Sequence, residues 1–158
     1  MPDLALYQPD IAGNTGALMR LAACMGVTLH IVEPAGFHLD DRALKRAGMD
    51  YLDIAAVARH LDWDGFEAWR GTSGRRLVLM TTAAGMAYTD FAFHHDDLIL
   101  LGRESAGVPR QVHACADHRL VIPMAAGGRS LNVALAGAMV LGEAIRQTGR
   151  AGRLPPRS

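Results

Sequence analysis

The sequence predicts an α/β domain in which a mostly parallel sheet is covered by helices on both faces. Three observations lead to this prediction. Apolar runs of strand length alternate with segments of helical periodicity, several of these runs are apolar throughout, and the 158 residues suffice for one hydrophobic core. Strands that are apolar throughout are typical of sheets buried on both faces. We expect a single domain over residues 1–150 and a short, flexible, basic tail at residues 151–158.

Two strands and three helices are predicted in the first half of the chain. Residues 4–9 alternate in polarity and end at a proline, as a strand does. Asn14 or Thr15 can cap the helix that follows, apolar side chains recur at helical spacing from Leu18, and Gly26 can end it. Aspartates that can act as caps precede the two later helices. We expect strands at residues 4–9 and 28–34, and helices at residues 14–26, 40–47 and 62–71.

Three apolar strands and one long helix are predicted in the second half. The strands are nearly uncharged inside, and the helix follows a glycine turn. We expect strands at residues 75–82, 97–102 and 118–123, and a helix at residues 130–148. That last helix is apolar on nearly every face, so we expect it to be buried on all sides.

The composition excludes several classes of protein. Half of the residues are hydrophobic and the formal net charge is zero, as in ordinary globular domains. No apolar stretch is long enough to span a bilayer, and the N-terminus lacks the basic start of a signal peptide. Two cysteines without CxxC spacing form no disulfide framework, and the histidines lack metal-ligand spacing. We therefore expect a cytoplasmic protein that binds neither a membrane nor a metal.

Three glycine-rich, polar segments each follow a predicted strand, at residues 11–16, 102–109 and 123–132. They match neither the phosphate-binding GxxxxGK[ST] loop, nor the dinucleotide-binding GxGxxG loop, nor the GxSxG of serine hydrolases. Ligands of parallel sheets bind beyond the carboxyl ends of the strands, and glycine lets a ligand approach the backbone. Such a cradle would suit a ligand with an adenine ring, ribose hydroxyls and an amino-acid end. The alternative is that the glycines only make tight turns.

The same three segments carry a resemblance to a known family. The motifs NTGALMR, LGRESAGVP and IPMAAGGRSLNVALAGA resemble, in order and spacing, the three motifs of the SPOUT-class RNA 2′-O-methyltransferases. The resemblance extends over nearly the whole chain. A further signature at residues 30–51 is similar to the small bacterial subgroup that methylates the wobble cytidine or uridine of tRNA.

The resemblance implies a C-terminal deep trefoil knot, a homodimer and S-adenosylmethionine as the cofactor. A partner subunit would also cover the remaining face of the last, apolar helix. By position in the motifs, seven residues are expected to bind the cofactor: Met80, Gly102, Glu104, Gly107, Ile122, Ser130 and Leu131.

Four residues are expected at the reaction site by the same resemblance: Arg20, Asn14, Ser130 and Asn132. Because a guanidinium stays protonated in proteins, we expect Arg20 to stabilise charge rather than to accept a proton. Asn14 and Ser130 can instead be plain helix caps, and the two roles can coexist.

The implied reaction transfers a methyl group to the ribose 2′-hydroxyl of the wobble nucleotide in the tRNA anticodon loop, with leucine tRNAs as the expected substrates. RNA phosphates would bind at Arg42, Lys45, Arg46, Arg129 and Arg150. The arginines of the tail can bind RNA or merely be solvated. Two alternatives stay open: 2′-O-methylation of ribosomal RNA or of another tRNA site, and a knotted RNA-binding dimer without catalysis.

Overall fold

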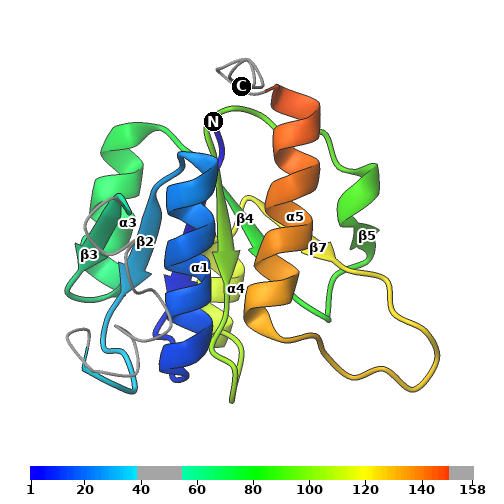
Figure 1. Cartoon of the computed structure of the whole chain (residues 1–158), viewed down its shortest axis with the longest axis horizontal. Helices are drawn as coiled ribbons and strands as arrows, with labels where there is room; N and C mark the ends of the chain where they lie inside the picture. The colour runs from blue at the N-terminus through cyan, green and yellow to red at the C-terminus, as the bar shows by residue number, and fades with distance from the viewer. Residues whose placement is uncertain (39–54, 150–158) are drawn as a thin grey trace, which may run out of the picture.

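A computed structural model describes residues 1–38 and 55–149 of the chain, as a sheet with helices on both sides (Figure 1). The first elements in this part are β1 (Asp3–Tyr7), α1 (Ala12–Met25), β2 (Leu29–Val32), β3 (Val57–His60), α3 (Trp63–Ser73) and β4 (Arg76–Met80). They are followed by β5 (Met86–Ala87), the 3-10 turn η2 (Tyr88–Asp90), β6 (Asp97–Leu101), α4 (Arg110–Cys115), β7 (His118–Val121) and α5 (Val133–Thr148).

The sheet has the strand order β3-β2-β1-β6-β4-β7-β5, and each of these neighbouring pairs is parallel. This confirms the predicted parallel sheet. Because the strands run in one direction, their carboxyl ends lie along one edge. β1 lies between β2 and β6, so its carboxyl end, which leads into α1, lies near the middle of that edge.

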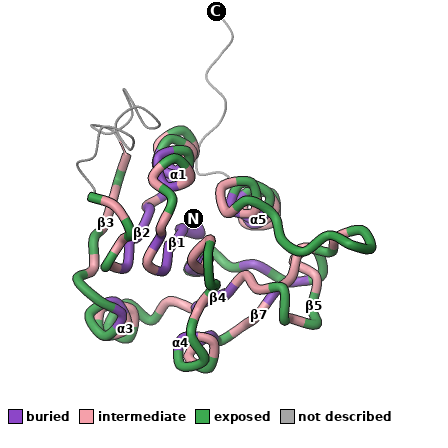
Figure 2. Tube along the Cα trace, turned by 90° about the horizontal axis from the view of Figure 1, so that it is seen from below, coloured by how far each residue is buried: buried purple, intermediate pink, exposed green. Residues whose placement is uncertain are grey.

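Two hydrophobic layers cover the two faces of the sheet, with α1 and α5 on one face and α3 and α4 on the other (Figure 2). The alternation of side chains in β1 shows why. Leu4 and Leu6 pack into the layer that contains α1 and α5, whereas Ala5 and Tyr7 pack into the layer that contains α3 and α4. All five residues of β1 are buried, which explains why the strand is so apolar.

The sequence predicted most strands and α-helices of the described region but missed three of them. Gly26 ends α1 in the left-handed conformation, and the Asp62 carboxylate caps α3 by accepting from the Gly65 N–H at 2.7 Å. Short β3, two-residue β5 and six-residue α4 were not predicted, because segments of this length carry too little periodicity. The predicted helix at residues 40–47 lies outside the described residues.

The predicted starts of two helices were wrong. α1 begins at Ala12, so Ile11 occupies the N-cap position and its side chain makes no capping hydrogen bond. Neither Asn14 nor Thr15 is therefore the cap of α1. α5 begins at Val133 rather than at Ser130, because the side chain of Asn132 is the N-cap. Both corrections bear on the candidate site, since they leave Asn14 and Ser130 without a capping role.

Gly137 allows α5 to pack closely against α1 and the sheet. It is buried, and a Cβ atom there would lie 2.7 Å from Leu18 Cδ2 and 2.9 Å from Leu101 Cδ1. Both leucines are themselves almost fully buried, so the added carbon would press on two closely packed side chains. The missing side chain at Gly137 therefore sets the spacing between α5 and β6.

We expect Gly137→Ala to lower the free energy of unfolding by about 1–3 kcal/mol, because the added methyl overpacks the core. Gly71→Ala is the matched control. Gly71 is an exposed residue of α3 where a Cβ would meet nothing within 4 Å, so the same substitution should stabilise by about 0.5–1 kcal/mol. Urea unfolding of both variants measures the difference. Equal shifts for the two glycines would contradict the packing argument.

Candidate functional site

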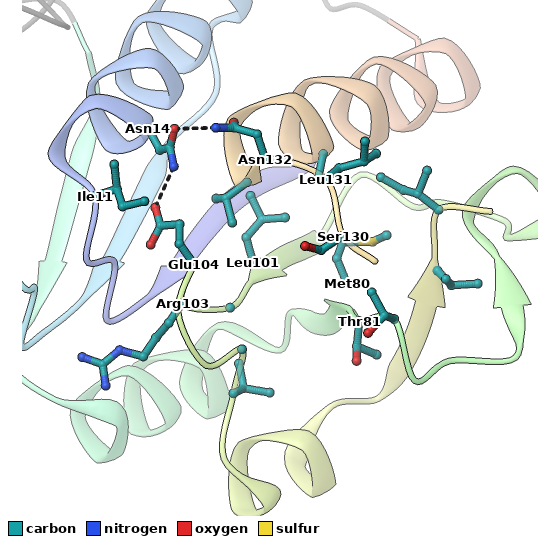
Figure 3. A pocket seen from close by; sticks show the side chains of 18 of the residues that line it. Ile11, Asn14, Met80, Thr81, Leu101, Arg103, Glu104, Ser130, Leu131 and Asn132 are labelled. Carbon is teal, nitrogen blue, oxygen red and sulfur yellow. Dashed lines mark hydrogen bonds between the residues drawn. The ribbon is translucent and has the colours of Figure 1, made fainter. Parts of the chain in front are cut away.

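A pocket of about 440 Å³ lies at the carboxyl edge of the sheet (Figure 3). Its walls come from segments far apart in the sequence. They are the start of α1, the ends of β4, β6 and β7, the loop after β6, and the segment that leads into α5. The three segments singled out in the sequence thus meet at one cavity. Two of them are loops, whereas residues 12–16 already belong to α1.

The pocket is lined by nine of the site residues expected from the sequence resemblance, and Ser130 was expected in both roles. Its lining includes all seven expected cofactor residues, namely Met80, Gly102, Glu104, Gly107, Ile122, Ser130 and Leu131. The lining also includes three of the four residues expected at the reaction site, namely Asn14, Ser130 and Asn132. Sequence reasoning missed other lining residues, among them Thr81, which lies outside the three motifs, and Arg103 and Val108, which lie within the second motif but were not singled out.

The remaining expected residues lie elsewhere. Arg20 is exposed on α1 and is not part of the pocket lining. Arg129 is exposed in the segment before α5, next to Ser130, and does not line the pocket either. Arg42, Lys45, Arg46 and Arg150, expected at the RNA, lie outside the described residues.

Three polar side chains of the pocket form a hydrogen-bonded chain, drawn as dashed lines in Figure 3. The Asn132 side-chain amide donates to Asn14 Oδ1 at 2.8 Å. The Asn14 amide in turn donates to Glu104 Oε1 at 3.2 Å. The chain therefore links the start of α5, the first helix and the loop after β6 across more than a hundred residues of sequence.

The direction of this chain is set by backbone groups that cannot reverse. Asn132 Oδ1 accepts from the N–H groups of Ala134 and Leu135, at 2.8 and 3.2 Å, in the first turn of α5. Its NH₂ group must therefore face Asn14, which must accept with its oxygen and donate with its nitrogen. The last partner, Glu104, is left with an accepting role, which an ionised carboxylate fills best.

Both oxygens of Glu104 are used as acceptors. Oε1 accepts from Asn14, and Oε2 accepts from the backbone N–H of Asp10 at 3.0 Å. Burial raises the pKa of Glu104, and the nearby carboxyl group of Asp10 raises it further. The pKa of Asp10 is lowered by its hydrogen-bonding contacts with Glu104 and Ser105. On acidification Glu104 is therefore the first of the two carboxylates to be protonated, which weakens it as an acceptor for Asn14.

Glycines fold the loop after β6 tightly enough to present Glu104. Arg103 and Gly107 exchange two backbone hydrogen bonds, each 2.9 Å long. A Cβ atom at Gly102 would lie 2.8 Å from the backbone of Gly107, which itself has a φ of +63°. Both positions therefore require glycine for the loop to close. The turn before α5 has a similar requirement at Gly127, where φ is +92°.

The chemistry of the lining fits S-adenosylmethionine. A cavity of about 440 Å³ is of the size that holds a small-molecule cofactor. Met80, Leu101 and Ile122 offer apolar surface to a planar ring, while Ser130 and Thr81 offer hydroxyl groups to the polar parts. In the described part of the chain, no three His, Cys, Asp or Glu residues cluster in a way that could hold a metal ion.

The fixed direction of the hydrogen-bonded chain predicts a paired effect of substitutions on stability. Asn14→Asp removes the donor and sets a second carboxylate against Glu104. The free energy of unfolding should fall by about 1–3 kcal/mol, which outweighs the ~0.3–1 kcal/mol that a carboxylate gains near the start of a helix. Adding Glu104→Gln should recover most of the loss, because the new amide donates to the new carboxylate and still accepts from Asp10. Unfolding of the four proteins gives the coupling energy. Purely additive losses would contradict the assigned direction.

Comparisons with known proteins agree with this geometry. The model of the SpoU rRNA Methylase family matches residues 2–142. A protein of Ancylobacter novellus named tRNA (cytidine(34)-2'-O)-methyltransferase is 63% identical over 146 residues, which are 92% of each chain.

Two solved structures share the fold over at least nine-tenths of this chain. One, described as giving structural insights into the 2-OH methylation of C/U34 on tRNA, has a TM-score of 0.89 at 37% identity and covers 93% of this chain and 95% of its own. The other is the SpoU methyltransferase AviRb of Streptomyces viridochromogenes in complex with AdoMet, with a TM-score of 0.84 at 27% identity, covering 93% of this chain and 60% of its own. The family model spans most of the sequence and the pocket joins all three of its motif segments, so the chain belongs to the SpoU rRNA methylase family.

Proposed function

We propose that this protein transfers a methyl group from S-adenosylmethionine to the ribose 2′-hydroxyl of nucleotide 34, a cytidine or a 5-substituted uridine, in the anticodon loop of tRNA. One observation carries the proposal. The three motif segments converge on a single pocket in a chain that matches a tRNA (cytidine(34)-2'-O)-methyltransferase at 63% identity over 92% of both lengths. We expect the reaction in the cytoplasm and leucine tRNAs among the substrates.

The pocket residues divide into two groups by their chemistry. Met80, Leu101 and Ile122 would hold the adenine ring, with backbone groups of the loops at Gly102 and Gly107 meeting its polar edge. Ser130, Leu131 and Glu104 would hold the ribose and amino-acid parts. When bound, S-adenosylmethionine supplies an electrophilic methyl group on a sulfonium.

The protein's own task is then alignment and charge stabilisation. Asn14 and Asn132 line the pocket, and each amide keeps one N–H that the hydrogen-bonded chain does not use. These groups would orient the ribose. Arg20 lies outside the cavity of its own chain, so we place it on the RNA, where it binds a phosphate next to the ribose and stabilises the developing negative charge on the 2′-oxygen. Arg129, which is exposed in the segment before α5, would make a second phosphate contact.

The exposed apolar face of α5 supports a homodimer. Leu135 is 59% exposed, Met139 is 42% exposed and Leu131, just before the helix, is 39% exposed. Within one chain α5 is therefore not buried on all sides as expected, because its buried residues are only Gly137, Val140, Leu141 and Ala144. A second copy of the chain would cover the exposed apolar side chains. The trefoil knot that the sequence resemblance implies is part of the same proposal. No helix in the described residues is long and apolar enough to cross a membrane.

Transfer of a labelled methyl group tests the proposed function directly. The protein is incubated with bulk tRNA and S-adenosylmethionine carrying an isotopic methyl, and the modified nucleotide is mapped by mass spectrometry. We expect one 2′-O-methyl group at position 34. Label found only in ribosomal RNA or at another tRNA position would replace the proposed substrate, and RNA binding without any label would favour the non-catalytic alternative.

Arg20 variants serve as the internal control of the same assay. Arg20→Ala should lower transfer by roughly 100-fold or more, the range seen when a transition-state donor is removed, while the Kd for S-adenosylmethionine stays within about twofold because Arg20 is outside the pocket. Arg20→Lys keeps the charge but loses the planar guanidinium group, so its rate of methyl transfer should lie between those of the wild type and Arg20→Ala. Near-normal turnover of Arg20→Ala would refute its assigned role.

Leu135→Arg tests the proposed dimer. A charge in the centre of an apolar interface should convert the dimer to monomers and abolish transfer, because the interface cannot pair the new cation. Leu61→Arg is the control, since Leu61 is 87% exposed and does not belong to α5. It should stay dimeric and active. Analytical ultracentrifugation gives the oligomeric state of both variants, and a fully active Leu135→Arg monomer would contradict the proposal.

A further inference from the structure

We propose that Asp10, which belongs to none of the three motifs, is a positioning residue for methyl transfer. It fixes the loop after β6 against the start of α1 and thereby holds Glu104 where Asn14 can donate to it. The inference rests on the proposed function, because its role is defined relative to that reaction. Asp10 does not line the pocket, so it acts through other residues and does not touch a ligand there.

Asp10 contacts three consecutive residues of the loop after β6. Its backbone N–H donates to Glu104 Oε2 at 3.0 Å. Its carboxylate oxygen Oδ2 accepts a hydrogen bond from the Ser105 hydroxyl and lies 3.9 Å from Arg103 Nε. One residue at the end of the β1–α1 connection therefore holds both neighbours of Glu104 as well as Glu104 itself.

The backbone of Asp10 is held from the opposite side by the segment after β2. Gly36 N–H donates to the carbonyl of Pro9 at 2.8 Å, and a Cβ atom at Gly36 would lie only 2.9 Å from Asp10 Cβ. Asp10 is thus enclosed between two segments. Because Asp10 is held by its surroundings, its contacts with the loop after β6 restrict the movement of Glu104.

The charge of Asp10 also faces the carboxyl group of Glu104. Its oxygen Oδ1 is buried and makes no hydrogen bond among the described residues, so it can accept a proton carried by Glu104. This proximity raises the pKa of Glu104, on which burial acts in the same direction. The groups around the pair are Arg103 and Ser105 from the same loop and the neutral amide of Asn14 from α1. A protonated Glu104 accepts more weakly than a carboxylate, so its hydrogen bond from Asn14 should weaken and acidification should lower activity.

Two substitutions separate the contact of Asp10 from its charge. Asp10→Asn keeps an oxygen for the Ser105 hydroxyl but removes the negative charge, so the pKa of Glu104 should fall and the acidic limb of the kcat/KM profile should move to lower pH. Ser105→Ala keeps the charge but removes the contact, so kcat should fall roughly tenfold without that displacement. Asp10→Ala removes both the contact and the charge, so kcat should fall roughly 10- to 100-fold and the acidic limb of the kcat/KM profile should again move to lower pH. Asp64→Asn, an exposed acid on α3, is the control and should match wild type.

Each protein is also measured for its unfolding midpoint and for the Kd of S-adenosylmethionine by calorimetry. The inference holds if kcat and the acidic limb change as described while the unfolding midpoint changes little. It is overturned if the Asp10 variants keep the wild-type kcat and limb, or if activity falls only in proportion to lost stability with the limb unmoved. A wild-type protein that transfers no methyl group to tRNA would instead refute the proposed function.

Discussion

The site depends on one constraint, the direction imposed on the hydrogen-bonded chain from α5 to Glu104. Two neutral amides in series can point either way until a group that can only donate or only accept stands at one end. The backbone N–H groups of the first turn of α5 are the donors, and the Glu104 carboxylate is the acceptor. Asn132 therefore has two functions at once, because it caps α5 and orients Asn14.

The fold makes this constraint possible by bringing the two ends of the chain together. β1 occupies the middle of the sheet beside β6, and α1 packs against α5 on one face. The close approach at Gly137 brings α5 against Leu18 of α1 and Leu101 of β6. The pocket is lined by residues before Gly137 and Leu18 and by residues after Leu101. Packing on this face and polar order at the carboxyl edge are therefore two results of one arrangement.

The sequence predicted the pocket better than it predicted the starts of the helices that form it. Glycine-rich segments after apolar strands, together with the motif resemblance, identified all seven expected cofactor residues of the lining. The misassigned caps have one physical cause. An asparagine near a helix start has the same local pattern whether it caps its own helix or bonds across the fold, and Asn14 does the second whereas Asn132 does both. Only tertiary structure distinguishes these cases.

Residues that hold other residues carry even less sequence signal than residues that meet a ligand. Asp10 follows a strand and a proline, where an acid is unremarkable, and its importance comes from the return of the loop after β6 more than ninety residues later. The same contacts connect the shape of the site to its charge. Glu104 holds Asn14 best when it is ionised, and Asp10 both fixes Glu104 and raises its pKa. The contact that positions Glu104 therefore also makes the site more sensitive to acid. A neutral residue at position 10 would relax that sensitivity, but it would also leave the Arg103 guanidinium without the carboxylate that now faces it.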